Sequence, residues 1–326
     1  MYHIVYEFPS SSHPSFRHIK VTPRKVQIAT IHQDIHETLK WFREQKEEDI
    51  FLLLDESRFS FYRFDVHQDV DKPFSIHDLN NCIAEKINFI NKNHDTSGEK
   101  IHTFIDTLYV NEEETTHIIG EQGHIFFRLY VIYLRRQTLH TCNAVFGNIL
   151  EHSNIHIQPQ SLPTTLFVRN TLKKDNFLLL YIHENSCKAV YVQNGFYHNV
   201  QTINMGMAMV KTMYHDRGIS EYRYKSYETI EKNNLAKQLI IETLGFYCEM
   251  LCKRIQDINA SGWDIILISP MTKNGHFIEV FNTVYNKSCK RFILPFHQAD
   301  TLDNFDQKRE PEDMDILTFL NQKDKQ

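Results

Sequence analysis

Glycine is scarce in this chain. Only 10 of its 326 residues are glycine, less than half of the usual share of about 7%. Loops that bind phosphate through bare backbone depend on glycine, because a Cβ atom keeps the ligand away from the amide groups. The composition therefore argues against a protein with several such loops.

Cysteine is also sparse. The six cysteines are spread from Cys82 to Cys289, too far apart for the disulfide framework of a secreted domain. No apolar run approaches the ~18 to 20 residues that span a bilayer, and the first residues lack a basic region followed by an apolar core. We therefore expect a reduced, cytoplasmic protein that reaches the inner face of the membrane only through partners.

An excess of basic residues is missing as well. The chain has 36 Lys and Arg against 41 Asp and Glu, a formal net charge of −5. A general nucleic-acid binder needs a surplus of positive charge to neutralise phosphates, so that class is excluded. What remains, with 41% hydrophobic residues and a length that suits two domains, is a globular protein.

The first half opens with an apolar run at residues 50–54, followed by the polar turn that begins at Asp55 and by an aromatic alternation at residues 59–64. This pattern predicts a buried strand, a turn and a second strand. Farther on, Ser75 can cap a helix that extends to about Asn93, since isoleucine and leucine recur there at helical spacing. The stretch from 73 to about 155 reads as a small α/β unit.

The second half repeats the pattern. Residues 177–182 form an apolar run, a polar turn follows at 183–186, and the Asn194-Gly195 pair favours a tight hairpin before the next strand. A long amphipathic helix is predicted over residues 229–259 and a buried strand at 264–268. Two halves of similar pattern indicate a duplicated α/β fold.

In its order of elements, the chain over roughly residues 50–296 resembles the actin-like fold, and within it the bacterial FtsA and PilM group. The resemblance rests on the strands and turns just described and on the segment from 265 to Gly275. It implies a duplicated, ribonuclease H-like two-domain fold with a small inserted α/β subdomain. We expect an N-terminal extension (1–48), a first half (49–72 and 156–172), the insert (73–155), a second half (173–298) and an acidic tail (299–326).

In such folds, nucleotide lies between two turns that each combine an aspartate with glycines. Here the first turn is placed at Asp55, with Ser57 in a glycine position. In the second, Tyr181 replaces the aspartate, while His183 and Glu184 replace glycines. Bulky side chains narrow the cleft, and Glu184 would repel phosphate. The adenosine loop carries Ser269-Pro270 where glycines are expected.

The resemblance and these departures together predict an actin-like body that does not hydrolyse ATP and needs no cofactor or metal. Weak binding of ATP with Mg²⁺ stays open as an alternative, as does a functional ATPase with atypical loops. If nucleotide binds, Asp55 would lie nearest the metal. In the opposite interpretation, Asp55 only terminates a strand, and Gly206 and Gly275 only serve turns. The remaining candidate lining positions are Ser57, Ser186, Gly206, Ser269 and Gly275.

The tail suggests a partner site. Residues 313–320 place Ile316, Phe319 and Leu320 among acidic residues, similar to the terminal peptide of the tubulin-like division protein FtsZ. Such a peptide binds by burying two or three apolar anchors in a groove. The predicted function is a non-enzymatic scaffold in bacterial cell division or in envelope filament assembly, with protein partners and a capacity for self-association. A PilM-like adaptor of type IV pilus assembly is the alternative.

Overall fold

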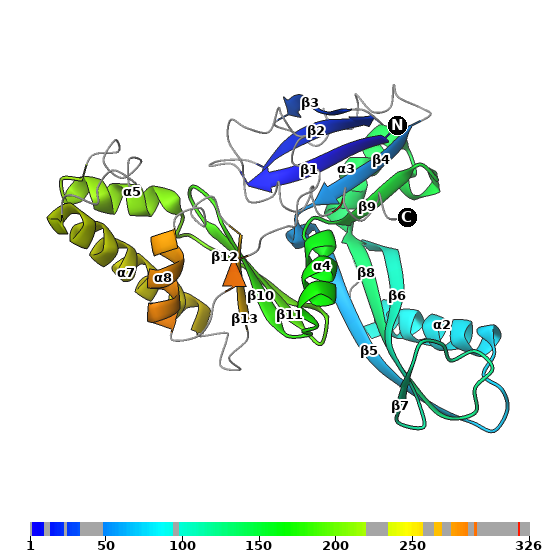
Figure 1. Ribbon diagram of the computed structural model, residues 1–326. Helices are drawn as coiled ribbons and strands as arrows, with labels where there is room; N and C mark the ends of the chain where they lie inside the picture. Colours follow the sequence, from blue (N-terminus) through cyan, green and yellow to red (C-terminus); the bar gives the residue numbers. More distant parts are fainter. Residues whose placement is uncertain are drawn as a thin grey trace. The chain divides into compact units, whose positions relative to one another are not determined.

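The structure is a computed structural model. It describes residues 2–9, 14–22, 25–32, 48–93, 98–219, 234–256, 264–268, 275–285, 290, 291 and 319. The chain divides into two compact units, residues 1–160 and 161–326, which are described separately (Figure 1). Within the described ranges, no helix is both long and apolar enough to span a membrane.

Unit 1 is built on a five-stranded sheet with the order β3-β2-β1-β4-β9. The strands β1 (Tyr2–Pro9), β2 (Pro14–Thr22) and β3 (Lys25–His32) form an antiparallel meander. The strands β4 (Asp49–Leu54) and β9 (Ile155–Pro159) continue the sheet in parallel with β1. Strand β4 is buried over Ile50 to Leu54, which explains its uninterrupted apolar sequence.

This pairing corrects three expectations: the N-terminal extension, the position of the run 50–54 as the first strand, and a hairpin between that run and the strand at 59–64. Residues 1–48 were assigned to an extension, but β1 pairs with β4 along its length, so the first half begins at residue 2. The apolar run at 50–54 is the fourth strand of the sheet and not the first. It also forms no hairpin with the strand after it, because β4 pairs with β1 and β9. Residues 33–46, whose sequence is typical of a helix, lie outside the described residues.

A second sheet is inserted between β4 and β9. Its strands, in the order β5-β8-β6-β7, are β5 (Phe59–Val70), β6 (Gly98–Val110), β7 (Glu113–Thr115) and β8 (Gly123–Arg135). The helix α2 (Ile76–Asn93) packs on one face of this sheet, around a core that includes Phe74, Ile90 and Phe127. We call residues 59–135 the insert. It starts earlier than the predicted 73, because β5 pairs with β8.

The start of α2 confirms the predicted cap. The Oγ of Ser75 accepts the amide of Asp78 at 3.2 Å, while the Asp78 carboxylate accepts the Ser75 amide at 2.9 Å. These reciprocal bonds satisfy amides that have no partner within the helix. After β8, α3 (Arg136–Phe146) and the short η2 (Ile149–Glu151) lead back to β9.

Unit 2 contains a five-stranded sheet with the order β12-β11-β10-β13-β14. The strands β10 (Phe177–Ile182), β11 (Cys187–Gln193) and β12 (Phe196–Ile203) are antiparallel, and β13 (Asp264–Ile268) and β14 (Lys290–Arg291) add in parallel. The predicted hairpin at Asn194-Gly195 is present, with φ of +53° and +80°, values that glycine and asparagine tolerate best.

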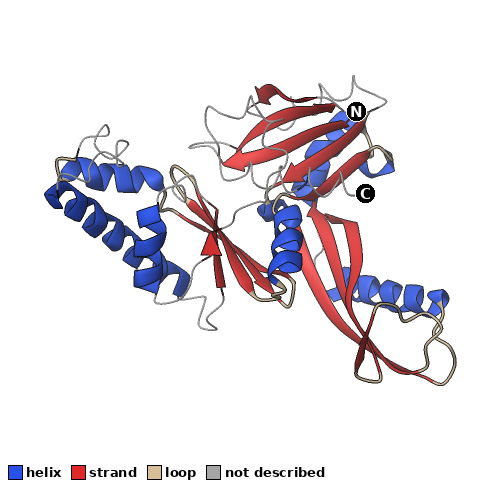
Figure 2. Ribbon diagram, in the orientation of Figure 1, coloured by secondary structure: helices blue, strands red, loops and turns tan. Residues whose placement is uncertain are grey.

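Helices pack against this sheet (Figure 2). They are α5 (Met207–Asp216), α7 (Asn234–Gln256) and α8 (Gly275–Tyr285), and α4 (Leu162–Leu172) precedes β10. The stripe predicted on α7 is buried at Ile240, Leu244, Tyr247, Leu251 and Ile255, together with the apolar face of β10 and β11. Cys248 and Cys252, four positions apart on α7, belong to the same core.

Candidate functional site

In unit 2, the turn between β10 and β11 lies against the start of α5. The turn spans His183 to Ser186 and is closed by the His183 amide, which donates to the carbonyl of Ser186 at 2.9 Å. The amide of Met207 donates to the carbonyl of His183 at 2.9 Å, and the amide of Ala208 donates to the carbonyl of Glu184 at 2.6 Å. Two amides of the first helical turn are thus bound by this turn.

Gly206 permits this close approach. A Cβ atom built at Gly206 would lie 2.4 Å from the carbonyl oxygen of Glu184, and equally close to backbone atoms of Asn185 and Ser186. Real Cβ atoms do not approach backbone so closely. The φ of Gly206 is −118°, so the requirement for glycine here is steric and does not come from backbone strain.

Charged side chains complete the contact. Lys211, one turn into α5, donates to Oε1 of Glu184 at 2.6 Å. On β10, the ring of Tyr181 lies beneath the ammonium of Lys188, whose Nζ is 4.9 Å from the ring centroid. Tyr181 itself is fully buried. The negative charge of Glu184 is therefore balanced within the chain, and a buried aromatic ring occupies the end of the strand.

In unit 1, the carboxyl ends of β1 and β4 meet because the two strands are parallel neighbours. Glu7 near the end of β1 is 5% exposed. It accepts two hydrogen bonds from Arg58, at 2.5 Å from Nε and 2.6 Å from the terminal nitrogen Nη2, and a third from the amide of Asp55 at 3.1 Å. This is a bidentate arginine–carboxylate pair.

Burial and charge act in opposite directions on this pair. Burial lowers the pKa of Arg58, but its hydrogen bond with Glu7 and the charge of Glu7 outweigh that effect, so the pKa is raised. Burial raises the pKa of the neighbouring Cys142 thiol to about 12, against the opposing influence of Arg58. Cys142 is therefore a neutral thiol at pH 7, and the charge of Arg58 is balanced by Glu7.

The structure brings some of the predicted site residues together. Asp55 and Ser57 are adjacent to Glu7, where Asp55 Oδ1 accepts the Ser57 amide at 2.9 Å and caps the short helix η1 (Glu56–Arg58). They follow the fourth strand of the chain and not the first, and their use as a phosphate turn stays a prediction. The turn that follows the first strand covers residues 10–13, outside the described residues.

In unit 2, Ser186 and Gly206 lie in the contact described above. Gly275 is the first residue of α8, and Ser269 lies outside the described residues. Of the tail anchors, Ile316 and Leu320 also lie outside them. Phe319 is only 5% exposed, which disagrees with the expectation of an anchor open to a partner. The use of any of these residues for nucleotide or partner binding stays a prediction.

Three residues that shape these contacts were missed from the sequence: Glu7, Arg58 and Lys211. Glu7 and Arg58 are 51 positions apart, and nothing local marks them as a pair. Lys211 carried a weak signal, since a lysine in the second turn of a helix can reach a carboxylate beside its start. No group of three or more metal-binding side chains gathers among the residues that the structure describes.

The two units share one strand order, with three antiparallel strands followed by two parallel ones. This duplicated ribonuclease H-like topology, with an insert after the fourth strand, is the actin-like ATPase fold. The strand topology itself confirms the duplicated α/β fold class predicted from the sequence.

Solved structures of this fold are similar to the chain. The PilM-PilN type IV pilus biogenesis complex matches with 11% identity over 97% of this chain and 96% of the other, at a TM-score of 0.46. A ROK family protein from Streptococcus pneumoniae matches with 10% identity over 99% of both chains, at 0.43.

A protein of unknown function with an actin-like ATPase fold, from Bacteroides thetaiotaomicron, matches with 9% identity over 97% of this chain and 95% of the other, at 0.37. No family model matches the sequence, nor does any curated protein. At these identities and TM-scores the similarities carry no argument about function.

Proposed function

We propose that this chain is an actin-like scaffold that binds other proteins and does not hydrolyse ATP. The observation that carries the proposal is the contact between the β10–β11 turn and the start of α5. The amides of Met207 and Ala208 already donate to the carbonyls of His183 and Glu184. An anion bound at a helix start needs such amides, because they supply the hydrogen bonds and the positive end of the helix dipole.

The same turn does not fit a triphosphate with magnesium. Carbonyl oxygens of the turn already accept the hydrogen bonds of these two amides, so phosphate oxygens would have to compete with them for the same donors. Glu184 adds a carboxylate whose charge is balanced by Lys211 at 2.6 Å. Phosphate would have to displace this ion pair and leave Glu184 beside it unpaired, so binding of ATP is disfavoured at each step.

Unit 1 gives independent support. A carboxylate that orients a metal-bound water needs an oxygen that is open to that water. Both oxygens of Glu7 accept hydrogen bonds from Arg58, and Oε2 also accepts the amide of Asp55. Asp55 in turn caps η1 through Oδ1. These carboxylates serve the structure of the strand ends.

The partners we propose belong to the division or pilus machinery. What supports them is the resemblance of the element order to the FtsA and PilM group, including an inserted subdomain. We assign the partner contacts to the folded body and not to the tail, since Phe319 is buried. A tail peptide could act as a docking segment only after Phe319 left its present surroundings.

One observation favours the alternative of a functional ATPase. Glu7 and Asp55 place two carboxylates at the ends of neighbouring parallel strands, the position where α/β folds commonly bind ligands. If Arg58 released Glu7 when nucleotide arrived, these groups could hold a metal. This alternative makes a prediction opposite to that of the scaffold.

Isothermal titration calorimetry of the full chain with ATP and Mg²⁺ separates the two. The scaffold proposal predicts no saturable heat at millimolar nucleotide, in the wild type and in Asp55→Ala alike. The ATPase alternative predicts a saturable signal that Asp55→Ala abolishes. Saturable binding that Asp55→Ala leaves unchanged would also contradict the proposal, because it would locate nucleotide at other residues.

Pull-down with purified proteins then separates the two kinds of partner. The immobilised full chain is offered the division protein FtsZ in one experiment and pilus assembly proteins in another. A variant that lacks residues 311–326 is the matched control. Retention of a partner by both forms supports contacts through the folded body. Binding by the full chain alone would assign the contact to the tail and contradict our placement.

A further inference from the structure

The outer strand of the insert is a long, regular sheet edge. Strand β5 pairs with β8 without a register shift from Phe59↔Leu134 to Val70↔Gly123. On its other side no strand pairs with it within the described part of the chain. The strand has 12 residues and contains no proline, glycine or lysine. Natural edge strands are usually short, bulged or interrupted by such residues, because a regular edge pairs readily with another chain.

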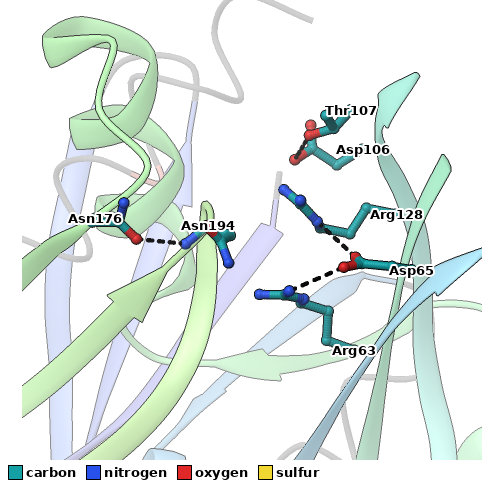
Figure 3. Close-up of polar contacts among 7 residues, drawn as sticks. All are labelled: Arg63, Asp65, Asp106, Thr107, Arg128, Asn176 and Asn194. Carbon is teal, nitrogen blue, oxygen red and sulfur yellow. Dashed lines mark hydrogen bonds and ion pairs between the residues drawn. The ribbon is translucent and has the colours of Figure 1, made fainter. Parts of the chain in front are cut away.

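The two faces of β5 differ in character. Phe64 and Val66 pack toward α2, so Arg63 and Asp65 point to the opposite face, since side chains alternate along a strand. Arg63 donates to Asp65 Oδ2 at 3.2 Å, and Arg128 on β8 donates to Asp65 Oδ1 at 3.0 Å (Figure 3). The side chains of Arg63 and Asp65 are 32% and 37% exposed.

An exposed aromatic group flanks the edge on the other face. Phe89 of α2 meets Phe64 edge-to-face, with ring centroids 6.1 Å apart and an interplanar angle of 88°. Phe89 is nevertheless 49% exposed, although α2 packs on the insert. Covering a large aromatic side chain with this exposure by a further surface is favourable, because it removes apolar area from water.

We propose that β5 pairs with β5 of a second copy of this chain, antiparallel and centred on Phe64, so that two inserts join into one continuous sheet. In this register, each residue pairs with the partner's residue that lies equally far from Phe64 on its other side. Arg63 then lies opposite the partner's Asp65, and Asp65 opposite the partner's Arg63. The charges of the edge are complementary to themselves under a two-fold axis, as an isologous interface requires.

The other face supports the same register. The two copies of Phe64 lie directly opposite each other, and Tyr62 lies opposite the partner's Val66. Aromatic and β-branched residues form favourable cross-strand pairs. Phe89 then lies beside the joint, where the second copy reduces its exposure. A shift by two residues in one direction would place Phe64 opposite Val66 and Asp65 opposite the partner's Asp65, which loses the aromatic pair and brings like charges together.

The inference concerns only the insert and does not rest on the proposed function. Self-association and nucleotide binding are separate measurements, so the failure of one leaves the other intact. The test is sedimentation velocity of the full chain over a wide range of micromolar concentrations. We expect a concentration-dependent dimer for the wild type.

Two charge reversals test the register. Arg63→Asp brings two acidic residues opposite each other, and Asp65→Arg brings two basic residues opposite each other, so each variant alone should dimerise at least about tenfold more weakly. Mixed in equal amounts, the two variants regain complementary pairs and should form a heterodimer. A variant that had merely failed to fold could not be restored by mixing.

Asp69→Arg is the matched control. It reverses a charge on the same face of β5, but at a position that does not lie opposite Arg63 of the partner. We expect its dimerisation to equal that of the wild type. The inference is overturned if the wild type stays monomeric at every concentration, if mixing fails to restore dimers, or if Asp69→Arg weakens the dimer as much as Asp65→Arg does.

Discussion

The amide of Ala208 donates to the carbonyl oxygen of Glu184 at 2.6 Å. This bond joins the first turn of α5 to the turn after the first strand of unit 2. Gly206, just before the helix, lets the two segments approach. The first amides of α5 thus donate to carbonyl groups of the chain's own backbone.

Gly206→Ala should destabilise the protein by about 2 kcal/mol or more, because the new methyl group would overlap three backbone atoms that cannot move independently. Gly245→Ala is the matched control. A Cβ at Gly245 in α7 meets nothing within 4 Å, so alanine there should stabilise the helix by about 0.5 to 1 kcal/mol.

Urea unfolding followed by circular dichroism measures both changes. Equal effects of the two substitutions, or a neutral Gly206→Ala, would show that the turn and the helix start are not held together as described.

Glu7→Gln should destabilise the protein by about 2 kcal/mol, since it leaves the charge of Arg58 without a counter-charge at a partly buried position. The double variant Glu7→Gln with Arg58→Met removes both charges, and its loss should be smaller than the sum of the single losses. Urea unfolding of the wild type, of Glu7→Gln, of Arg58→Met and of the double variant gives the coupling free energy between the two side chains. Additive losses would contradict a direct interaction between Glu7 and Arg58.

The sequence predicted unit 2 better than unit 1, for a physical reason. Strands that are buried on both faces, such as β10, are continuous apolar runs, and α7 shows its buried stripe at helical spacing. Strands β2 and β3 mix Arg, His, Lys and Gln with apolar residues, so no local pattern marked them. With those strands missed, the fourth strand was taken for the first.

The candidate site was predicted only in part. Tyr181, His183 and Glu184 stood out because they replace residues expected from the resemblance, and Gly206 was among the candidate residues. The contacts themselves depend on tertiary structure. Lys211 reaches Glu184 from a helix 27 positions away, and Arg58 reaches Glu7 across parallel strands. Sequence spacing carries no information about such pairs.

Stability should fall as the pH drops below about 6.5, through two histidines of unit 1. Burial lowers the pKa of His3 despite the opposing effect of Glu48, and burial lowers the pKa of His102 despite its bond to the carbonyl of Ile157. Below pH 6.5 the unfolded chain binds protons that the folded unit resists. Stability is therefore complete above that pH and is lost as the pH falls toward the lowered values.

His102→Gln should reduce this pH dependence, because glutamine can still donate to the carbonyl but does not titrate. His215→Gln is the control, since the side chain of His215 is 91% exposed. Urea midpoints at neutral and mildly acidic pH measure the difference. A pH dependence that His102→Gln leaves unchanged would contradict the assignment of this residue as a partly buried neutral imidazole.

Ser75→Ala should cost about 1 kcal/mol, because the Oγ of Ser75 caps the amide of Asp78 at the start of α2. Ser57→Ala is a suitable comparison. In the Asp55–Ser57 contact, the amide of Ser57 is the donor, and alanine keeps that amide. Thermal unfolding should show a lower midpoint for Ser75→Ala only. The helix cap would be refuted if both variants unfolded alike.

Amide hydrogen exchange at Met207 and Ala208, followed by NMR with and without ATP and Mg²⁺, tests the central claim most directly. If the turn carbonyls occupy these amides, both exchange slowly in the free protein and millimolar ATP with Mg²⁺ changes neither rate. Fast exchange in the free protein, slowed by nucleotide, would show instead that the start of α5 is an open phosphate site.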